Sequence, residues 1–209
     1  MYKKYFKRLL DFTLSFFALV VLSPLFLVLI ISGFFYMHGN PFFTQERPGK
    51  NEIIFKMLKF RSMNNKRDSS GKLLSDAERM NSYGKFIRGT SLDELPELIN
   101  ILKGDMSIVG PRPLRVYYLP WYTETEKHRH DVRPGLTGLA QINGRNNLDW
   151  DSRLALDVEY VLNISFAFDI KIILKTIAYV IKRKDVNVDN FEEGRLDEIR
   201  KLKLKVKTK

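Results

Sequence analysis

The chain has 209 residues, of which 44% are hydrophobic and 28% are charged. This length fits a single domain, and the composition excludes a disordered chain and a polytopic membrane bundle. The net charge is +11, but no zinc-finger, RNP, KH or helix-turn-helix motif accompanies it, so we expect no nucleic-acid partner. Because there is no cysteine, disulfides, thiolate metal sites and a cysteine nucleophile are also excluded.

The positive charge is concentrated at the two ends of the chain. Residues 1–10 contain four basic residues and no acidic one, and residues 195–209 contain seven basic and two acidic residues. Such ends suit an anionic lipid surface, where each Lys or Arg contributes about 1 kcal/mol. We therefore expect a membrane partner. The basic tail at 191–209 is either an electrostatic tether or a disordered, solvated segment.

Residues 12–37 form an uncharged, apolar run. As one straight helix the run would be about 39 Å long, enough to span a hydrocarbon core of about 30 Å. However, Ser23-Pro24 lies near its middle, where proline breaks or kinks a helix. Both flanks are also basic, which by the positive-inside rule places both ends on the cytoplasmic side. The residues alone leave a spanning helix and a re-entrant helix-break-helix open.

The remaining chain alternates strand-like and helical patterns. Residues 42–45 and 53–60, joined by a turn at 47–51, predict a β-hairpin. The polar segment 62–76 predicts a mobile surface loop. Ser91 lies three residues before Glu94, which predicts a capping box for a helix that ends at Gly104. The predicted helices lie at 76–83, 91–103, 114–128 with a bend at Pro120, 151–162 and 170–181.

Asp93 and Glu94 are the most suggestive acidic pair, because they fall in the first turn of the helix predicted at 91–103. The helix N-terminus favours anions and bound phosphate. An ionised carboxylate there can attack phosphorus, and its neighbour can hold Mg²⁺ together with substrate phosphate oxygens. The alternative is that both acids merely cap the helix.

Three arginines are candidate phosphate contacts, because each lies close to a glycine or proline turn. They are Arg88, Arg112 and Arg145, and Arg112 lies between two prolines that fix its backbone. Each could instead be a surface arginine. The turn-rich stretch 133–145 is the kind of loop that carries function, although it could be a connector.

Two further motifs contain residue types that can bind metal ions. His128 and His130 point to different faces of a helix, so they do not form a convincing metal site. Asp149 and Asp151 resemble the acidic pair of a nucleotide-sugar glycosyltransferase, although helix capping explains them as well. A membrane-anchored glycosyltransferase that uses this pair is therefore the alternative function.

Seven ordered stretches resemble the bacterial sugar transferase family, whose small members are monotopic phosphoglycosyl transferases. They cover nearly the whole chain. They are Ser23-Pro24, 43–49, 55–63, 91–96, 103–107, 110–113 and 133–145.

This resemblance implies that a sugar-1-phosphate passes from a UDP-sugar to a polyprenyl (undecaprenyl) phosphate, with release of UMP. It implies that Asp93 attacks the β-phosphorus and carries a covalent phosphosugar, and that Glu94 coordinates the Mg²⁺ cofactor. The phosphate and substrate contacts that it implies are Lys59, Arg88, Arg112, Arg133 and Arg145.

The resemblance also implies the architecture. We expect a helix-rich α+β fold: a re-entrant membrane hairpin at 1–40 with its break at Ser23-Pro24, a compact catalytic domain at 41–190 and the basic tail at 191–209. The protein would be monotopic at the cytoplasmic face of the bacterial inner membrane, at the first membrane step of glycoconjugate or polysaccharide biosynthesis. The sugar and the oligomeric state, including a homo-oligomer, stay open.

Overall fold

The computed structural model describes residues 1–144, 148–182 and 194–207. It is helix-rich with two small sheets, which confirms the predicted α+β class. The α-helices are α1 Lys7–Val21, α2 Ser23–Met37, α3 Asp76–Arg79, α4 Ser82–Gly89, α5 Glu97–Lys103, α6 Glu124–Lys127, α7 Leu139–Ile142, α8 Trp150–Leu162, α9 Phe166–Lys182 and α10 Leu196–Lys207. A π-helical turn, η1 Tyr2–Phe6, precedes α1, and the 3-10 turns are η2 Lys50–Glu52, η3 Leu92–Glu94, η4 Val116–Trp121 and η5 His128–His130.

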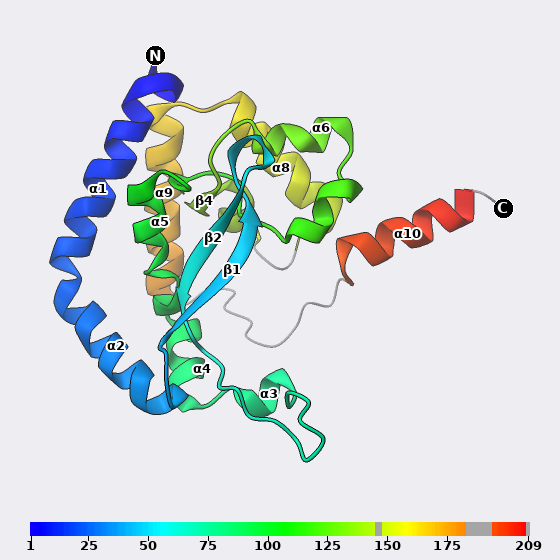
Figure 1. Ribbon diagram of the computed structural model, residues 1–209. Coiled ribbons are helices and arrows are strands. Elements are labelled where there is room, and N and C mark those ends of the chain that lie inside the picture. Colours follow the sequence, from blue (N-terminus) through cyan, green and yellow to red (C-terminus); the bar gives the residue numbers. More distant parts are fainter. Residues whose placement is uncertain (145–147, 183–193, 208–209) are drawn as a thin grey trace.

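The first two helices form an arc along one side of the molecule (Figure 1). α1 ends at Val21 and α2 begins at Ser23, with a bend of 65° between them. Pro24 lies in the first turn of α2 and has no N–H to donate to a carbonyl of α1. The predicted break at Ser23-Pro24 is therefore confirmed. None of the described helices is long and apolar enough to cross a membrane alone, but α1 and α2 taken together satisfy that criterion.

α1 has its polar and apolar faces reversed relative to a helix on the surface of a soluble protein. Its buried residues are Lys7, Asp11 and Ser15, all polar. Its large apolar side chains face outward, with Phe17 exposed at 59% and Val21 at 73%. The outer face of α1 is therefore apolar.

The buried polar side chains attach α1 to the rest of the molecule. The Nζ of Lys7 lies 2.7 Å from Oδ2 of Asp169 in α9. Asp11 accepts hydrogen bonds from Oγ of Ser107 at 2.6 Å and from the backbone N–H of Ile108 at 3.0 Å. These contacts fix the direction of α1 against the rest of the protein.

The predicted hairpin is confirmed as strands β1 Phe42–Pro48 and β2 Ile54–Phe60, which run across the front of Figure 1. They pair antiparallel from Phe42 opposite Phe60 to Pro48 opposite Ile54. Lys59 is the penultimate residue of β2, so it lies at the end of the strand that is far from the turn.

Two predicted helices are wrong in extent. The helix predicted at 76–83 is two helices, α3 and α4, and Asn81 starts the second by accepting from the N–H of Gly84. The helix predicted at 114–128 is η4, α6 and the start of η5. Pro120 lies inside η4, and Thr123 with Glu126 forms a capping box that begins α6. Local caps and proline therefore divide both segments.

A second sheet, which the sequence did not predict, is the parallel pair β3 Ser107–Val109 and β4 Gly135–Thr137. The backbones at Gly110 and Gly135 approach so closely that a Cβ on Gly135 would lie 2.1 Å from the nitrogen of Gly110. The close contact fixes the loop that starts at Gly110 and carries Arg112.

The helices predicted at 151–162 and 170–181 are confirmed as α8 and α9. They pack with α7 and β3 around a common apolar core. The buried residues of this core are Val109, Val132, Leu139, Ile142, Tyr160, Val161 and Ile172.

Within the basic tail, residues 196–207 form α10, so the disordered alternative is wrong for this stretch. Leu196 is fully buried beside Tyr118 and Trp150. Arg200 pairs with Glu126 at 2.6 Å and donates to the carbonyl of Trp121. The first turns of α10 therefore belong to the packed structure, on the side of the molecule opposite α1 (Figure 1).

Candidate active site

Asp93 and Glu94 lie in a single 3-10 turn, η3, rather than in the first turn of α5. The predicted capping box is wrong, because Ser91 has a left-handed backbone (φ 56°) and its side chain caps nothing. Pro96 has no N–H and cannot continue an α-helical ladder from η3, so α5 starts only at Glu97. The two acids are thus presented on a short turn between α4 and α5.

Lys59 of β2 reaches two acids of this region. Its Nζ lies 2.6 Å from Oε1 of Glu94 and 3.1 Å from Oε1 of Glu97. Only 17% of the Lys59 side chain and 4% of the Glu97 side chain are exposed. The three side chains therefore form a partly desolvated ionic cluster directly beside Asp93.

Arg112 approaches Glu94 from the loop after β3. Its guanidinium NH2 lies 2.8 Å from Oε1 of Glu94. The backbone carbonyl of Arg112 accepts a hydrogen bond of 2.6 Å from Arg129, which is buried and paired with Asp157 at 2.8 Å. A buried ion pair thus holds the backbone that carries the exposed guanidinium.

Arg88 of α4 completes the basic surroundings. Its Nε donates to Oγ of Ser62 at 2.9 Å, which orients the guanidinium. Arg88 is close enough to Asp93 for its charge to lower the pKa of that carboxyl. Thus Lys59, Arg88 and Arg112, three of the five predicted phosphate contacts, surround the predicted acidic pair.

The two neighbouring acids have opposite pKa shifts. Burial, reinforced by the negative charge of Glu94, raises the pKa of Asp93 to about 6. Burial also opposes ionisation of Glu94, but Arg112 and Lys59 outweigh it and hold the pKa of Glu94 well below its usual range. Glu94 therefore stays ionised, whereas Asp93 titrates near neutral pH and is a stronger nucleophile when ionised than an ordinary carboxylate.

Glu97 and Ser62 belong to the site although the sequence analysis did not select them. Burial, followed by the charge of Glu94, raises the pKa of Glu97 to about 7. The sequence did contain a signal for Glu97, because it is a third acidic residue only three positions after Glu94. Ser62 lies in the stretch 55–63 that resembles the family, but its contact with Arg88, 26 positions away, could not be predicted from local sequence.

Arg133 lies elsewhere. Its Nε donates to the carbonyl of Gly104 at 2.6 Å, at the end of α5 opposite Glu94. Arg8 of α1 donates to the carbonyls of Ile101 and Leu102 at the same end. Arg133 is therefore placed as a cap for the C-terminus of α5, where cations are favoured. Arg145, the fifth predicted contact, lies outside the described residues.

The acidic pair fits Mg²⁺ if a substrate completes the coordination. Mg²⁺ is usually held by one or two carboxylates together with substrate phosphates. Both cations on Glu94 contact Oε1, and its Oε2 has no hydrogen-bond partner among the described residues. In the same residues no set of three or more acidic, histidine or cysteine side chains could hold a metal ion by itself. Asp93 and Glu94 could thus hold the ion only with oxygens from a ligand.

The alternative acidic pair has structural roles. Asp149 is the N-cap of α8 and accepts hydrogen bonds from the backbone N–H and Oγ of Ser152 at 2.7 Å each. Asp151 faces Arg200 of α10, with its Oδ1 3.2 Å from the guanidinium. These contacts favour the capping explanation over a glycosyltransferase metal site.

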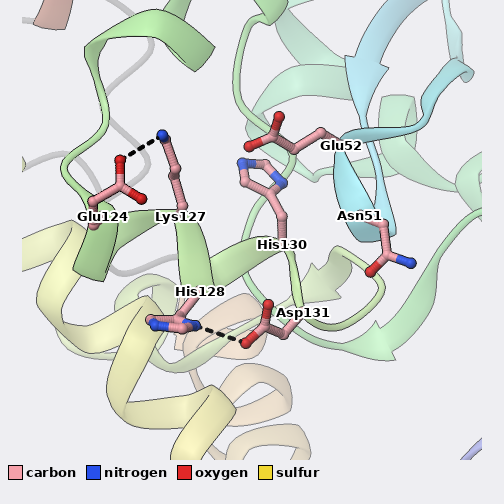
Figure 2. Close-up of a pocket in the computed structure, with 7 residues that line it drawn as sticks. All are labelled: Asn51, Glu52, Glu124, Lys127, His128, His130 and Asp131. Carbon is pink, nitrogen blue, oxygen red and sulfur yellow. Dashed lines mark hydrogen bonds and ion pairs between the residues drawn. The ribbon is translucent and has the colours of Figure 1, made fainter.

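The histidine motif borders a separate cavity of about 340 Å³, at the turn of the hairpin and far along β2 from Lys59 (Figure 2). His128 pairs with Asp131 at 2.9 Å, and Nδ1 of His130 lies 3.3 Å from the carbonyl oxygen of Gly49. Burial, then the charge of Arg129, lowers the pKa of His130 to about 4, so its ring is neutral. The two histidines therefore have separate partners, Asp131 and the backbone of Gly49.

Comparisons with known proteins identify the family. The bacterial sugar transferase model matches residues 2–183, so this chain belongs to the bacterial sugar transferase family, as its motifs predicted. The chain is 46% identical over 184 residues to an uncharacterized sugar transferase, EpsL, of Bacillus subtilis. That match covers 88% of this chain and 91% of the relative.

Two longer relatives carry names that state an activity. One is the undecaprenyl-phosphate galactose phosphotransferase of Salmonella typhimurium, 37% identical over 86% of this chain and 41% of its own length. The other is the UDP-glucose:undecaprenyl-phosphate glucose-1-phosphate transferase of Klebsiella pneumoniae, 39% identical over 82% of this chain and 39% of its own. This chain therefore spans about two fifths of each.

Proposed function

We propose that this protein transfers a sugar-1-phosphate from a UDP-sugar to a polyprenyl phosphate such as undecaprenyl phosphate and releases UMP. The main observation in support of this proposal is the position of Asp93. Its carboxyl, whose pKa is raised to about 6, lies beside an ionised Glu94 and three cationic side chains. The names of the Salmonella and Klebsiella relatives support both the acceptor and the donor class.

In the first step, ionised Asp93 attacks the β-phosphorus of the donor. A bond forms between a carboxylate oxygen and phosphorus, and the bond from that phosphorus to the bridging oxygen breaks, so UMP leaves with the electron pair. Lys59, Arg88 and Arg112 stabilise negative charge that develops on the phosphoryl oxygens. The product is a phosphosugar ester on Asp93.

In the second step, a phosphate oxygen of the polyprenyl phosphate attacks the same phosphorus. The Asp93–phosphorus bond breaks, the carboxylate is restored, and a polyprenyl diphosphate sugar forms. A carboxylate whose charge is already poorly solvated is a reactive nucleophile in the first step.

The proposed cofactor is Mg²⁺, which Glu94 would hold together with donor oxygens. When bound, the ion would neutralise diphosphate charge and polarise the phosphoryl group. Glu94 itself would orient the diphosphate, because its Oε1 is fixed by Lys59 and Arg112.

We also propose that α1 and α2 form a re-entrant membrane hairpin, which makes the protein monotopic at the cytoplasmic face of the bacterial inner membrane. The apolar outer face of α1 and the 65° bend at Ser23-Pro24 support this arrangement. Leu92 and Leu95, which flank the acidic pair, pack against the core that α2 contributes to. The candidate nucleophile would thus lie near headgroup level, within reach of a soluble nucleotide and a lipid phosphate.

The test uses the full chain in detergent micelles with UDP-sugars that carry ³²P in the β-phosphate. Without acceptor, we expect one equivalent of UMP and retention of ³²P on the protein. Added undecaprenyl phosphate should discharge the label into lipid. Asp93→Asn should retain no label, whereas the exposed-loop control Asp68→Asn should behave as wild type.

Two outcomes would overturn the proposal. Retention of label in Asp93→Asn would assign the nucleophile to another residue. Release of UDP instead of UMP would favour a glycosyltransferase.

A further inference from the structure

A mostly apolar cavity of about 230 Å³ opens beside the candidate nucleophile. Glu94 and Ser91 lie at one part of its wall, so the cavity and the acidic pair share a boundary. The rest of the wall comes from Leu95 and from β3, β4, α7 and α9. These lining residues are Leu95, Ile108, Leu136, Thr137, Gln141, Ile142, Ile173, Thr176, Ile177, Tyr179 and Val180.

The few polar groups in the wall are mostly satisfied within the protein. The hydroxyls of Thr137 and Thr176 are 2.7 Å apart, and Thr176 also donates to the carbonyl of Ile172. Gln141 donates its Nε2 to the carbonyl of Leu136 at 3.1 Å. Because these groups bond to one another, the cavity offers mainly hydrocarbon surface to a ligand.

The cavity is continuous with an exposed apolar stripe on α9. Ile177 and Val180 line the cavity and are also exposed at 50% and 43%. Further along the same face, Leu174, Ile170 and Phe166 are exposed at 62%, 37% and 54%. Their spacing of three and four residues places them in one row. An apolar chain could therefore leave the cavity along α9 in contact with apolar side chains.

We propose that this cavity binds the first isoprene units of the polyprenyl phosphate and so places the lipid phosphate at Asp93. The proposal rests on the function proposed above. The cavity is smaller than the 300–1,000 Å³ typical of sites that enclose a whole drug-sized ligand. It therefore holds only the phosphate-proximal end of the lipid, and the remaining chain passes along α9 into the bilayer.

The sugar of the donor is the competing occupant. The buried Oε1 of Gln141 has no hydrogen-bond partner among the described residues and would suit a sugar hydroxyl. The predominantly apolar wall favours the isoprenoid, because burying several sugar hydroxyls against it would leave them without partners. The two possible occupants can be distinguished kinetically. Changes in a lipid site would affect the acceptor step, whereas changes in a sugar site would affect the donor step.

The experiment compares two substitutions on one face of α9. Ile177→Asp places a charge in the cavity wall, whereas Leu174→Asp places the same charge on a somewhat more exposed residue outside the cavity. The full chain is assayed in phosphatidylethanolamine–phosphatidylglycerol nanodiscs with undecaprenyl phosphate and, separately, with geranyl phosphate. Ile177→Asp should raise the KM for both acceptors by about tenfold or more. Leu174→Asp should change the KM for geranyl phosphate by less than about twofold, because this short acceptor ends within the cavity and does not reach the α9 stripe.

The donor-only step separates this proposal from the proposed function. Formation of the labelled protein from the UDP-sugar alone should be unchanged in Ile177→Asp. Equal effects of the two substitutions on the KM for geranyl phosphate, or a raised KM for the donor, would overturn the lipid site. Absence of donor-dependent UMP release in the wild type would instead refute the proposed function.

Photocrosslinking of the wild type provides a test that does not depend on folding of a variant. A geranyl phosphate with a diazirine on its second isoprene unit should label peptides within 136–142 and 173–180, and undecaprenyl phosphate should compete. Labelling confined to α1 and α2 would contradict the proposal.

Discussion

The Nζ of Lys59 lies 2.6 Å from Oε1 of Glu94, so a strand cation is partly buried against the acid that neighbours the candidate nucleophile. Lys59→Met would leave Glu94 and Glu97 short of a counter-charge. We expect a loss of about 2–3 kcal/mol in the free energy of unfolding and a fall of about 10- to 100-fold in donor turnover. Thermal scanning fluorimetry and UMP release measure the two effects. The exposed strand residue Lys56, replaced in the same way, should show neither.

The pH dependence of the donor step should report on Asp93. Its pKa is raised to about 6, and only the ionised form can attack phosphorus. The rate of labelling should therefore rise with pH, reach half of its maximum near pH 6 and level off about one unit higher. Since Lys59 lowers the pKa of Asp93, the midpoint in Lys59→Met should move to higher pH. An unshifted midpoint in that variant would mean that another group controls the profile.

Ser62 should act as a positioning residue for Arg88. Ser62→Ala removes the hydroxyl that accepts the 2.9 Å hydrogen bond from Arg88 Nε. We expect kcat/KM for the donor to fall by about 5- to 10-fold, the size of one typical hydrogen bond. Steady-state kinetics with saturating acceptor test this. Ser70→Ala, in the exposed loop, is the matched control, and an equal effect there would exclude a specific role of Ser62.

The requirement for Mg²⁺ should depend on Glu94. Chelation with EDTA should abolish UMP release, and added Mg²⁺ should restore it. In Glu94→Gln the Mg²⁺ concentration for half-maximal rate should rise by about tenfold, because one charged oxygen ligand is lost. Titration of the donor step with Mg²⁺ provides the measurement, with the exposed Glu46→Gln as control. Full activity after exhaustive chelation would contradict the proposed cofactor.

The buried pair of Arg129 and Asp157 should stabilise the fold and the loop of Arg112. Arg129→Met would leave Asp157 buried without its partner at 2.8 Å, which should cost about 3–5 kcal/mol of unfolding free energy. Lys127→Met breaks an ion pair of similar length, 2.7 Å to Glu124, but on the exposed surface. The melting temperature of that control should hardly change, because solvent screens the pair. Equal losses in the two variants would refute the role assigned to burial.

The sequence by itself determined the features that short-range patterns carry. The hairpin at 42–60, the break at Ser23-Pro24 and helices α8 and α9 follow from alternation, proline and helical periodicity, which act within one or two turns of chain. The motifs also determined the family. The acidic pair, Lys59 and Arg112 were found because each lies in a motif, whereas Arg88 was found from its position close to a glycine turn.

Only the tertiary structure decided the contacts between distant segments. Lys59 meets Glu94 across 35 positions, Ser62 orients Arg88, and Arg133 caps α5 at the end opposite Glu94. The parallel pairing of β3 with β4 and the cavity beside Glu94 likewise join segments that share no local pattern. Periodicity describes one element at a time, whereas burial, charge neutralisation and close glycine contacts depend on how several elements pack together.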